Sequence, residues 1–403
     1  MTQEEAVINF PSEVVKEGKT KVVVPKLSSY RKQPSDYAPS KAPVFYNPVM
    51  ELNRDIAILV AQVYQHKVNR EISICEPLTS SGIRGVRLAT EVQNVRVTLG
   101  DINKHAFQLA KHNVALNMLG DRVTVQNEDA NCLLSCHSAQ YKRFDIIDVD
   151  PFGSPIPYLD SAIRALRNKG FLAITATDLA PLCGVHVKAC VRKYGGKPLR
   201  TEYCQELAIR LVAGSAVTAA ARQDIGIRIV FSHSTDHYVR IYFEIEYGAK
   251  KADESVKNLG YVLHCYNCLH RETAKTVFEV DTCPECSGKI DYAGPLWLGN
   301  IFDKTFCESM EKENEHVALR NSGRIDKLLT LAKNEAEAPP TYYVIDKVSN
   351  KLRLPVPSLE AMTKLLISSG FSAVPTHFNS RGLRTEAPAL KISDLVQKAV
   401  QFT

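Results

Sequence analysis

The chain has 403 residues, enough for two domains or more, and its hydrophobic fraction of 45% is ordinary for a globular protein. A formal net charge of +6 and a pI of about 8.6 make it mildly basic, which allows a nucleic-acid partner without requiring one. No run of 18 apolar residues is present, and the opening MTQEEAVINF lacks the apolar segment of a signal peptide. We therefore expect neither a membrane span nor a membrane partner.

The chain contains eleven cysteines, which is a high and odd number. Four of them form two Cys-x-x-Cys pairs, and the other seven share no spacing, so we expect those seven to be packing residues. With no signal peptide, this pattern favours metal binding in a reducing cytoplasm over disulfides. We therefore expect a cytoplasmic protein.

The first fifty residues are rich in proline and lysine. Residues 19–25 are typical of an edge strand that Pro25 ends, because proline cannot donate to a strand ladder. A helix is predicted from about Glu51 to Lys67.

Seven strand candidates lie between residues 72 and 247. They alternate with helices as far as residues 171–177, and a long helix follows near 201–222. Two further strands, 225–232 and 238–247, are separated by five residues and should form a hairpin. Five alternating strands and a final hairpin predict an α/β fold: a doubly wound sheet with one antiparallel strand.

The ends of three predicted strands suit an adenosine-containing ligand. The first strand runs through Glu76 into a small-residue turn, where Gly82 allows the backbone to approach a ligand closely. The second ends at Asp101, about twenty residues past Gly82, the spacing at which an acid reaches ribose hydroxyls. The third leads to Asp129 and Ala130, where an acid and a backbone amide suit an adenine edge. The turn is not GxGxxG, so a ligand without a pyrophosphate is indicated.

A fourth strand end carries Asp150-Pro151-Phe152, directly after the apolar run 144–147. A carboxylate accepts an N–H, a proline fixes the backbone so that a carbonyl accepts another, and a ring stacks on a flat base. The combination therefore suits an amino group on a base. The alternative is an ordinary strand-to-helix turn, since Asp-Pro and glycine are common turn residues.

The polar segment 249–256 predicts a junction between domains 1–250 and 251–403. Beyond it, the two Cys-x-x-Cys pairs are separated by fourteen residues, a spacing typical of a zinc knuckle. The predicted ligands are Cys265, Cys268, Cys283 and Cys286. Four cysteines leave no open coordination position, so this zinc should stabilise the fold and take no part in catalysis.

Two basic segments are candidates for phosphate contacts. Residues 186–200 contain no acid and include two adjacent glycines, which predicts a mobile basic loop on the face that holds the site, although a solvated loop is the simpler interpretation. The segment 374–388 follows a helix and resembles part of a winged-helix nucleic-acid reader. The expected phosphate contacts are Lys188, Arg192, Lys193, Lys197, Arg381 and Arg384.

With these residues in view, the chain resembles the tRNA (guanine-26, N2)-dimethyltransferase family, in its shorter archaeal form, over nearly its whole length. The segments that carry the resemblance are 45–55, 80–87, 150–155, the cysteine quartet and 377–385. The resemblance implies a class I, Rossmann-like methyltransferase sheet with a smaller α+β zinc-containing domain. It also implies S-adenosylmethionine as methyl donor and a guanine N2 amine in tRNA as acceptor, with no obligate protein partner evident.

The resemblance also assigns roles by motif position. The implied donor-binding residues are Phe45, Arg54, Glu76, Arg84, Asp101, Asp129 and Ala130. Glu76 stands where many methyltransferases have aspartate. Arg54 would pair with the donor carboxylate through its fork of nitrogens, unless it is a surface charge of its helix. The implied catalytic residues are Asp150, Pro151 and Phe152.

Chemistry explains the last assignment. The guanine amine is conjugated and poorly nucleophilic, so the enzyme must orient it toward the methyl group, with Asp150 as hydrogen-bond and proton acceptor and Phe152 stacked on the flipped base. Two other function classes remain open. One is a methyltransferase acting on a DNA base or on protein glutamine, and the other is a non-catalytic RNA-binding module. A nicotinamide dehydrogenase is disfavoured because GxGxxG is missing.

Overall fold

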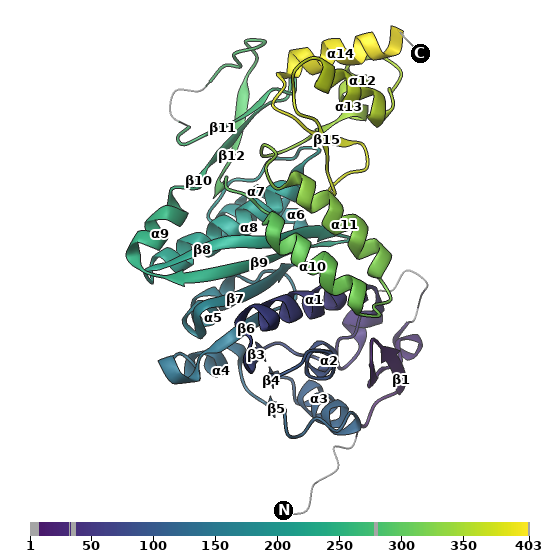
Figure 1. Ribbon diagram of the computed structural model, residues 1–403, viewed down its shortest axis with the longest axis vertical. Helices are drawn as coiled ribbons and strands as arrows, with labels where there is room; N and C mark the ends of the chain where they lie inside the picture. The colour runs from purple at the N-terminus through teal and green to yellow at the C-terminus, as the bar shows by residue number, and fades with distance from the viewer. Residues whose placement is uncertain (1–7, 32, 34–37, 278–280, 402–403) are drawn as a thin grey trace, which may run out of the picture. The chain divides into compact units, whose positions relative to one another are not determined.

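The computed structural model describes residues 8–31, 33, 38–277 and 281–401 (Figure 1). The chain divides into two compact units. The first, which we call the N-unit, holds the described residues up to Pro151 together with Tyr158–Ile174 and Glu308–Lys327. The second, the C-unit, holds Phe152–Pro157, Thr175–Cys307 and the described residues from Leu328 onward.

Seven strands form the main sheet, in the order β5-β4-β3-β6-β7-β9-β8. Their bounds are β3 (Ile72–Glu76), β4 (Val95–Gly100), β5 (Val123–Gln126), β6 (Phe144–Val149), β7 (Leu166–Ala176), β8 (Ile225–Thr235) and β9 (Tyr238–Tyr247). β3 to β7 pair in parallel, with Ile74 opposite Val97 on one side and Ile146 on the other, and β8 pairs with β9 antiparallel. The predicted α/β sheet with five alternating strands and a final hairpin is confirmed.

The N-unit surrounds its strands with helices and a small hairpin. The helices are α1 (Glu51–Val68), α2 (Ile83–Glu91), α3 (Lys104–Leu116), α4 (Ala130–Cys136) and α5 (Leu159–Arg164). The predicted edge strand is β2 (Thr20–Pro25), which pairs with β1 (Ser12–Glu17). α1 ends at Asn69, which adopts a left-handed φ of 47° and bonds Gln65 O.

The C-unit contains the remaining helices α6 (Leu179–Leu182), α7 (Val187–Tyr194), α8 (Cys204–Ala221), α9 (Ala249–Val256), α12 (Ile345–Leu352), α13 (Leu359–Ser368) and α14 (Ala389–Gln401). Its two small sheets consist of β10 (Leu259–Cys265), β11 (Arg271–Ala274) and β12 (Ile290–Trp297), and of β13 (Tyr343–Val344), β14 (Val374–Pro375) and β15 (Gly382–Arg384). Two further helices, α10 (Lys304–His316) and α11 (Ser322–Glu335), are labelled in Figure 1.

The division into units differs from the boundary predicted after residue 250, and packing explains the difference. α8 packs closely on β12, because a side-chain carbon at Gly214 would lie 3.1 Å from Leu296 Cα. Within the N-unit, the end of α10 and the start of α11 bond to α1, with His66 Nδ1 2.6 Å from Glu313 and Asn321 Nδ2 2.8 Å from Asp55. Contacts distant in sequence therefore override the polar segment that predicted the junction.

Residues 186–200 also differ from expectation. Most of this segment is helix α7, and Gly195 ends it in the left-handed conformation with φ 71°. Gly196 lies so close to β12 that a side-chain carbon there would be 2.6 Å from Pro295 O. The two glycines thus serve a helix end and a close approach, and the prediction of a mobile loop is wrong.

A buried ionic network in the C-unit is centred on Glu335. Its carboxylate accepts hydrogen bonds from Arg384 Nε at 2.7 Å and from the backbone N–H of His377 at 2.8 Å, and it lies 2.9 Å from His377 Nδ1. Arg384 Nη1 also donates to Glu206 on α8 at 3.0 Å. Burial opposes ionisation of Glu335, but the charges of His377 and Arg384 prevail and hold its pKa at about 2.

This network predicts an acid-sensitive contribution to stability. Because the folded-state pKa of Glu335 lies below its usual 4.5, its contribution is complete above pH 4.5 and is lost as pH falls toward 2. We expect Glu335→Gln to lower the unfolding temperature at pH 7, and the gap to wild type to narrow at pH 3. Thermal unfolding followed by circular dichroism measures this, with the exposed Glu337→Gln as matched control. A gap that stays constant between pH 7 and pH 3 would contradict the assignment.

Candidate functional site

Parallel strands bring the predicted acids to one edge of the N-unit. Glu76 ends β3, Asp101 follows β4, and Asp148 and Asp150 lie at the end of β6. Because these strands run in the same direction, their carboxyl ends meet at one edge, where open α/β sheets bind ligands.

The guanidinium of Arg84, on α2, lies among these acids and is only 4% exposed. Its Nε donates to Glu76 Oε1 at 3.2 Å and its Nη1 to Asp148 Oδ2 at 3.1 Å. Its Nη2 contacts Asp150 Oδ2, and Nη1 also donates to Asn53 Oδ1 at 2.8 Å. One buried cation thus contacts three carboxylates and fixes the direction of Asp150.

Glu76 stabilises the turn between β3 and α2. Its Oε2 accepts from Thr79 Oγ1 at 2.8 Å and from the backbone N–H of Gly85 at 3.2 Å. Burial raises the pKa of Glu76 to about 7, although Arg84 opposes that shift. Three carboxyl groups surround one arginine, so acidic groups outnumber the cation at this edge. Both carboxylate oxygens of Glu76 bond protein groups, and its predicted contact with a ligand stays a prediction.

Hydrogen bonds bring the predicted turn after β3 next to Asp101 and Phe45. Asp101 accepts from the backbone N–H groups of Ser80 at 2.8 Å and of Asn103 at 2.9 Å. Ser80 adopts a left-handed φ of 52°, and its hydroxyl donates to Phe45 O at 2.6 Å. Asp101 therefore fixes the backbone of a turn whose small residues border the same edge.

Ile102 is a residue that sequence reasoning missed. It directly follows Asp101 and is 69% exposed, which is unusual for isoleucine. Asn127 Nδ2 donates to both Asp101 O at 2.8 Å and Ile102 O at 3.1 Å, which fixes this segment. The signal in the sequence was an apolar residue immediately after the acid at a strand end.

Asp129 and Ala130 lie at the start of α4. Asp129 caps the helix, since its Oδ1 accepts from the backbone N–H groups of Asn131 at 2.9 Å and Cys132 at 3.1 Å. Ala130 is buried. The acid identified in the sequence is thus occupied with the helix end, and its role toward a ligand stays a prediction.

Arg54 is neither a surface charge nor free. It is 5% exposed, and its Nε and Nη2 donate to the two oxygens of Glu17 at 2.6 and 2.7 Å. Arg87 joins the same cluster, with Nη1 3.0 Å from Glu17 and 2.7 Å from Asp55. The surface-charge alternative is therefore wrong. Pairing with a donor carboxylate stays a prediction, because here both fork nitrogens contact Glu17.

The Asp-Pro-Phe segment presents a ring beyond the acid. The side chain of Asp150 is 17% exposed, whereas Phe152 is 73% exposed. In the C-unit, Gly153 adopts φ 79° and exchanges two hydrogen bonds with Thr177: its N–H donates to Thr177 Oγ1 at 2.7 Å and its carbonyl accepts from Thr177 N at 2.9 Å. An exposed aromatic ring on a fixed loop suits stacking on a base.

The predicted phosphate contacts differ in availability. Lys188 and Arg192 are exposed on α7. Lys193 donates to Asp178 at 2.9 Å, and Lys197 contacts Asp291. The other two predicted contacts lie near the C-terminus. Arg381 is about one-third exposed and donates to Asp346 at 2.8 Å.

Arg384 corrects the sequence analysis. It is 1% exposed and ion-paired with Glu335 and Glu206, so it cannot reach a phosphate. Because β15 places it in the core, its positive charge stabilises the C-unit internally. The basic character of a segment in sequence did not reveal this burial.

The four predicted zinc ligands come together at the end of β10 and before β12. Their Sγ atoms all lie within 4.8 Å of one another, and Cys265–Cys286 and Cys268–Cys283 are each 3.5 Å apart. Leu269 and Ser287 adopt left-handed φ values of 66° and 55° and donate to Cys265 O and Cys283 O, which closes both knuckle turns. Thiolates bound to one zinc at about 2.3 Å are roughly this far apart, so the four residues fit a structural zinc.

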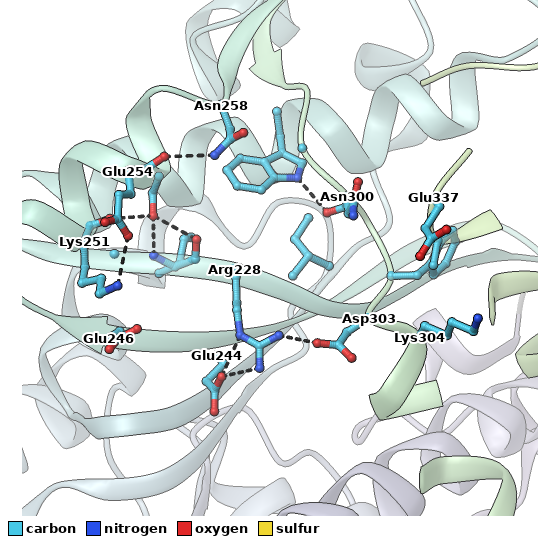
Figure 2. A pocket seen from close by; sticks show the side chains of 18 residues that line it. Arg228, Glu244, Glu246, Lys251, Glu254, Asn258, Asn300, Asp303, Lys304 and Glu337 are labelled. Carbon is cyan, nitrogen blue, oxygen red and sulfur yellow. Dashed lines mark hydrogen bonds and ion pairs between the residues drawn. The ribbon is translucent and has the colours of Figure 1, made fainter. Parts of the chain in front are cut away.

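A separate cavity of about 700 Å³ lies in the C-unit (Figure 2). Arg228 stands in it with Glu244 at 2.6 Å and Asp303 at 2.5 Å, and Glu246 and Glu254 add further acids. None of the predicted site residues lines it. Its excess of carboxylates is unsuited to a phosphate-bearing ligand.

Comparisons with known proteins match this chain over nearly its whole length. A family model described as N2,N2-dimethylguanosine tRNA methyltransferase matches residues 18–397. A tRNA (guanine(26)-N(2))-dimethyltransferase of Methanobrevibacter smithii is 42% identical over 96% of this chain and 98% of its own. One of Methanothermobacter thermautotrophicus is 39% identical, over 95% and 98%. The solved structure of Trm1 from Pyrococcus horikoshii with S-adenosyl-L-methionine has a TM-score of 0.83 and 33% identity, over 95% of this chain and 99% of that one.

No helix among the described residues combines the length and apolar character needed to span a bilayer.

The zinc knuckle gives a prediction. We expect about one zinc per chain, lost in Cys283→Ser, and because ligand binding is coupled to folding, that variant should unfold at lower temperature while still binding the methyl donor. Elemental analysis and calorimetry measure the two effects, with the exposed Cys132→Ser as control. Less than about half an equivalent of zinc in fresh protein with all four cysteines intact would contradict it.

Proposed function

Since the chain belongs to the N2,N2-dimethylguanosine tRNA methyltransferase family, we propose that it transfers methyl groups from S-adenosylmethionine to the exocyclic N2 of a guanine in tRNA. By analogy with the named relatives, the acceptor is guanine 26 and two methyl groups are added. The observation that carries the proposal is Asp150, held by buried Arg84 at the carboxyl edge of the sheet and followed directly by exposed Phe152.

The donor-binding residues follow from the N-unit edge. Asp101 would accept hydrogen bonds from the ribose hydroxyls with the carboxylate lone pairs that its bonds to the turn do not use. Ile102 offers an exposed apolar surface for the adenine ring. The Phe45 carbonyl is bonded to Ser80, whose N–H donates to Asp101, and Ala130 begins α4 after the neighbouring strand β5. S-adenosylmethionine supplies the methyl group on a cationic sulfonium, and the excess of carboxyl groups over the one cation Arg84 suits a cation at this edge.

Asp150 acts on the acceptor. Its carboxylate would accept an N–H of guanine, direct the amine lone pair, and take up the proton that the amine releases on methylation. Arg84 keeps that carboxylate in one orientation, and Pro151 fixes the backbone between it and Phe152. Phe152 would stack on the base once it has been flipped out of the RNA. Orientation is the main contribution, because the conjugated amine is a weak nucleophile.

Binding of tRNA would involve α7. Lys188 and Arg192 are exposed beside exposed Val187 and Val191, so this face offers both charge and apolar contact to an RNA backbone. Asp178 orients the helix, because it accepts from Tyr194 Oη at 2.5 Å as well as from Lys193. Arg381 is a further candidate. A cytoplasmic location is the proposal most consistent with this substrate and with eleven cysteines.

The role of Asp150 is tested by Asp150→Ala. We expect methyl transfer to tRNA to fall by about a hundred-fold or more, the usual effect of losing a general base, while donor binding stays within a few-fold. Tritium transfer and a donor titration measure the two quantities, with exposed Asp253→Ala as control. Mass spectrometry of the modified nucleoside identifies the base that receives the methyl groups. A tRNA with adenine at position 26 tests whether that position is the acceptor. Near-normal turnover by Asp150→Ala would refute its role.

The role of α7 is tested by Lys188→Gln with Arg192→Gln. Fewer counterions would be released on binding, so we expect a tRNA Michaelis constant several-fold higher and a flatter dependence on salt, with donor affinity unchanged. The matched control is Lys250→Gln with Lys257→Gln, two exposed lysines on and just after α9. If the α7 variant matched wild type at every salt concentration, the tRNA-binding face would lie elsewhere.

A further inference from the structure

One face of β4 and β5 is polar, which is unusual for a parallel sheet. Strands in such sheets are normally covered on both faces and are apolar throughout. Here Val95, Val97 and Leu99 of β4 are buried, while Arg96 is exposed and Thr98 is half-buried. In β5, Val123 is buried and Thr124 is exposed, while Val125 and Gln126 are both half-buried.

The apolar face is the one that the helices cover. Leu99 packs against α2, since a side-chain carbon on Gly85 would lie 2.2 Å from Leu99 Cδ2. On the other face, α4 has only seven residues, from Ala130 to Cys136. So short a helix leaves the polar sides of β4 and β5 uncovered.

That uncovered face forms a cavity of about 640 Å³, which we call the amino-edge cavity. Its charged lining comprises Arg96, Arg122, Lys142 and Asp121. Thr98, Thr124 and Gln126 contribute hydroxyl and amide groups. Three cations against one carboxylate, with neutral donors between them, are the groups that bind phosphate oxygens.

The cations of the cavity are oriented but not neutralised. Arg96 Nε lies 2.9 Å from Glu71 and Arg122 Nε 3.8 Å from Asp121, and all four side chains are more than 40% exposed. Exposed pairs of this kind are weak and open readily to another anion. Arg96 Nη1 also donates to the backbone carbonyl of Asp121 at 3.3 Å, a contact that directs the guanidinium without cancelling its charge.

The cavity belongs to a longer basic row. Every parallel strand of the N-unit has an arginine at or beside its amino end, and in the order of the strands from β5 to β7 these are Arg122, Arg96, Arg70, Arg143 and Arg167. The positive charge of this row is partly compensated, because Arg70 and Arg167 both form ion pairs with the buried Asp145. The nitrogen-to-oxygen distances are 2.5 Å for Arg70 and 3.5 Å for Arg167. Tyr141, which is 80% exposed, lies beside the cavity with Lys142 Nζ 5.8 Å from its ring centre.

We propose that the amino-edge cavity binds the phosphodiester backbone of RNA, as a second contact with the tRNA substrate. The cations suit phosphates, the hydroxyl and amide groups suit ribose, and Tyr141 offers a ring to an unpaired base. The cations of the cavity lie near the amino ends of β4, β5 and β6. Its lining extends to Gln126, which ends β5 and whose carbonyl accepts from Asp101 N at 3.2 Å. One RNA segment along this face would therefore contact the cavity and approach the carboxyl edge. This inference rests on the proposed function for the identity of the RNA.

The test is the triple variant Arg96→Gln, Arg122→Gln and Lys142→Gln in the full chain. With unmodified tRNA transcript as probe and no donor present, we expect roughly ten-fold weaker binding at low salt. The slope of log affinity against log salt should become shallower by about two, since two to three phosphate contacts are lost. Turnover at saturating tRNA and donor affinity should stay unchanged. The control replaces Lys16, Lys19 and Lys111 by glutamine, three exposed lysines of the same unit.

Equal tRNA affinity and equal salt slope in the triple variant and wild type would overturn the proposal, as would an identical loss in the control. Binding and methylation are measured separately, so the two proposals can fail independently. If the wild-type protein bound tRNA through this cavity without methylating it, the RNA-binding role of the cavity would be supported and the proposed function would be refuted. A short oligouridylate should displace tRNA from the wild-type protein but not from the triple variant. That result would further support a contact with the RNA backbone.

Discussion

The site depends on one buried guanidinium. Arg84 contacts Glu76, Asp148 and Asp150, which come from the ends of two neighbouring strands. Carboxylates this close repel one another, and the arginine between them offsets that repulsion. Burial strengthens the attraction, and removing the arginine would leave uncompensated charges in the interior. The orientation of Asp150 is thus a consequence of α2 placing Arg84 at the sheet edge.

Arginines have two distinct uses in this chain, and burial separates them. Arg54, Arg84, Arg87 and Arg384 are almost fully buried and each contacts at least one carboxylate. Arg96 and Arg192 are exposed at surfaces rich in positive charge. Buried pairs determine the positions of elements, whereas exposed cations remain available to a polyanion. The mild net charge of the whole chain therefore understates how basic its surface is.

The sequence predicted what local pattern controls. The alternation of strands and helices, the final hairpin, the zinc-knuckle spacing and the convergence of acids at strand ends all follow from periodicity or short motifs. Burial of Arg384 did not follow, because its partners Glu206 and Glu335 are 178 and 49 residues away. The helix at 187–194 was missed because its glycines were interpreted as flexibility. The polar face of β4 was visible as Val-Arg-Val-Thr, but the lack of a covering helix is a property of the fold.

The N-unit is discontinuous along the chain, since residues 308–327 complete it after more than 130 residues of the C-unit have intervened. During synthesis the ribosome therefore releases β3 to β6 long before it releases the helical segment that contacts α1. Until then the surface of α1 around Asp55 and His66 lacks its native partners. The N-unit is therefore completed only after both Cys-x-x-Cys turns have left the ribosome.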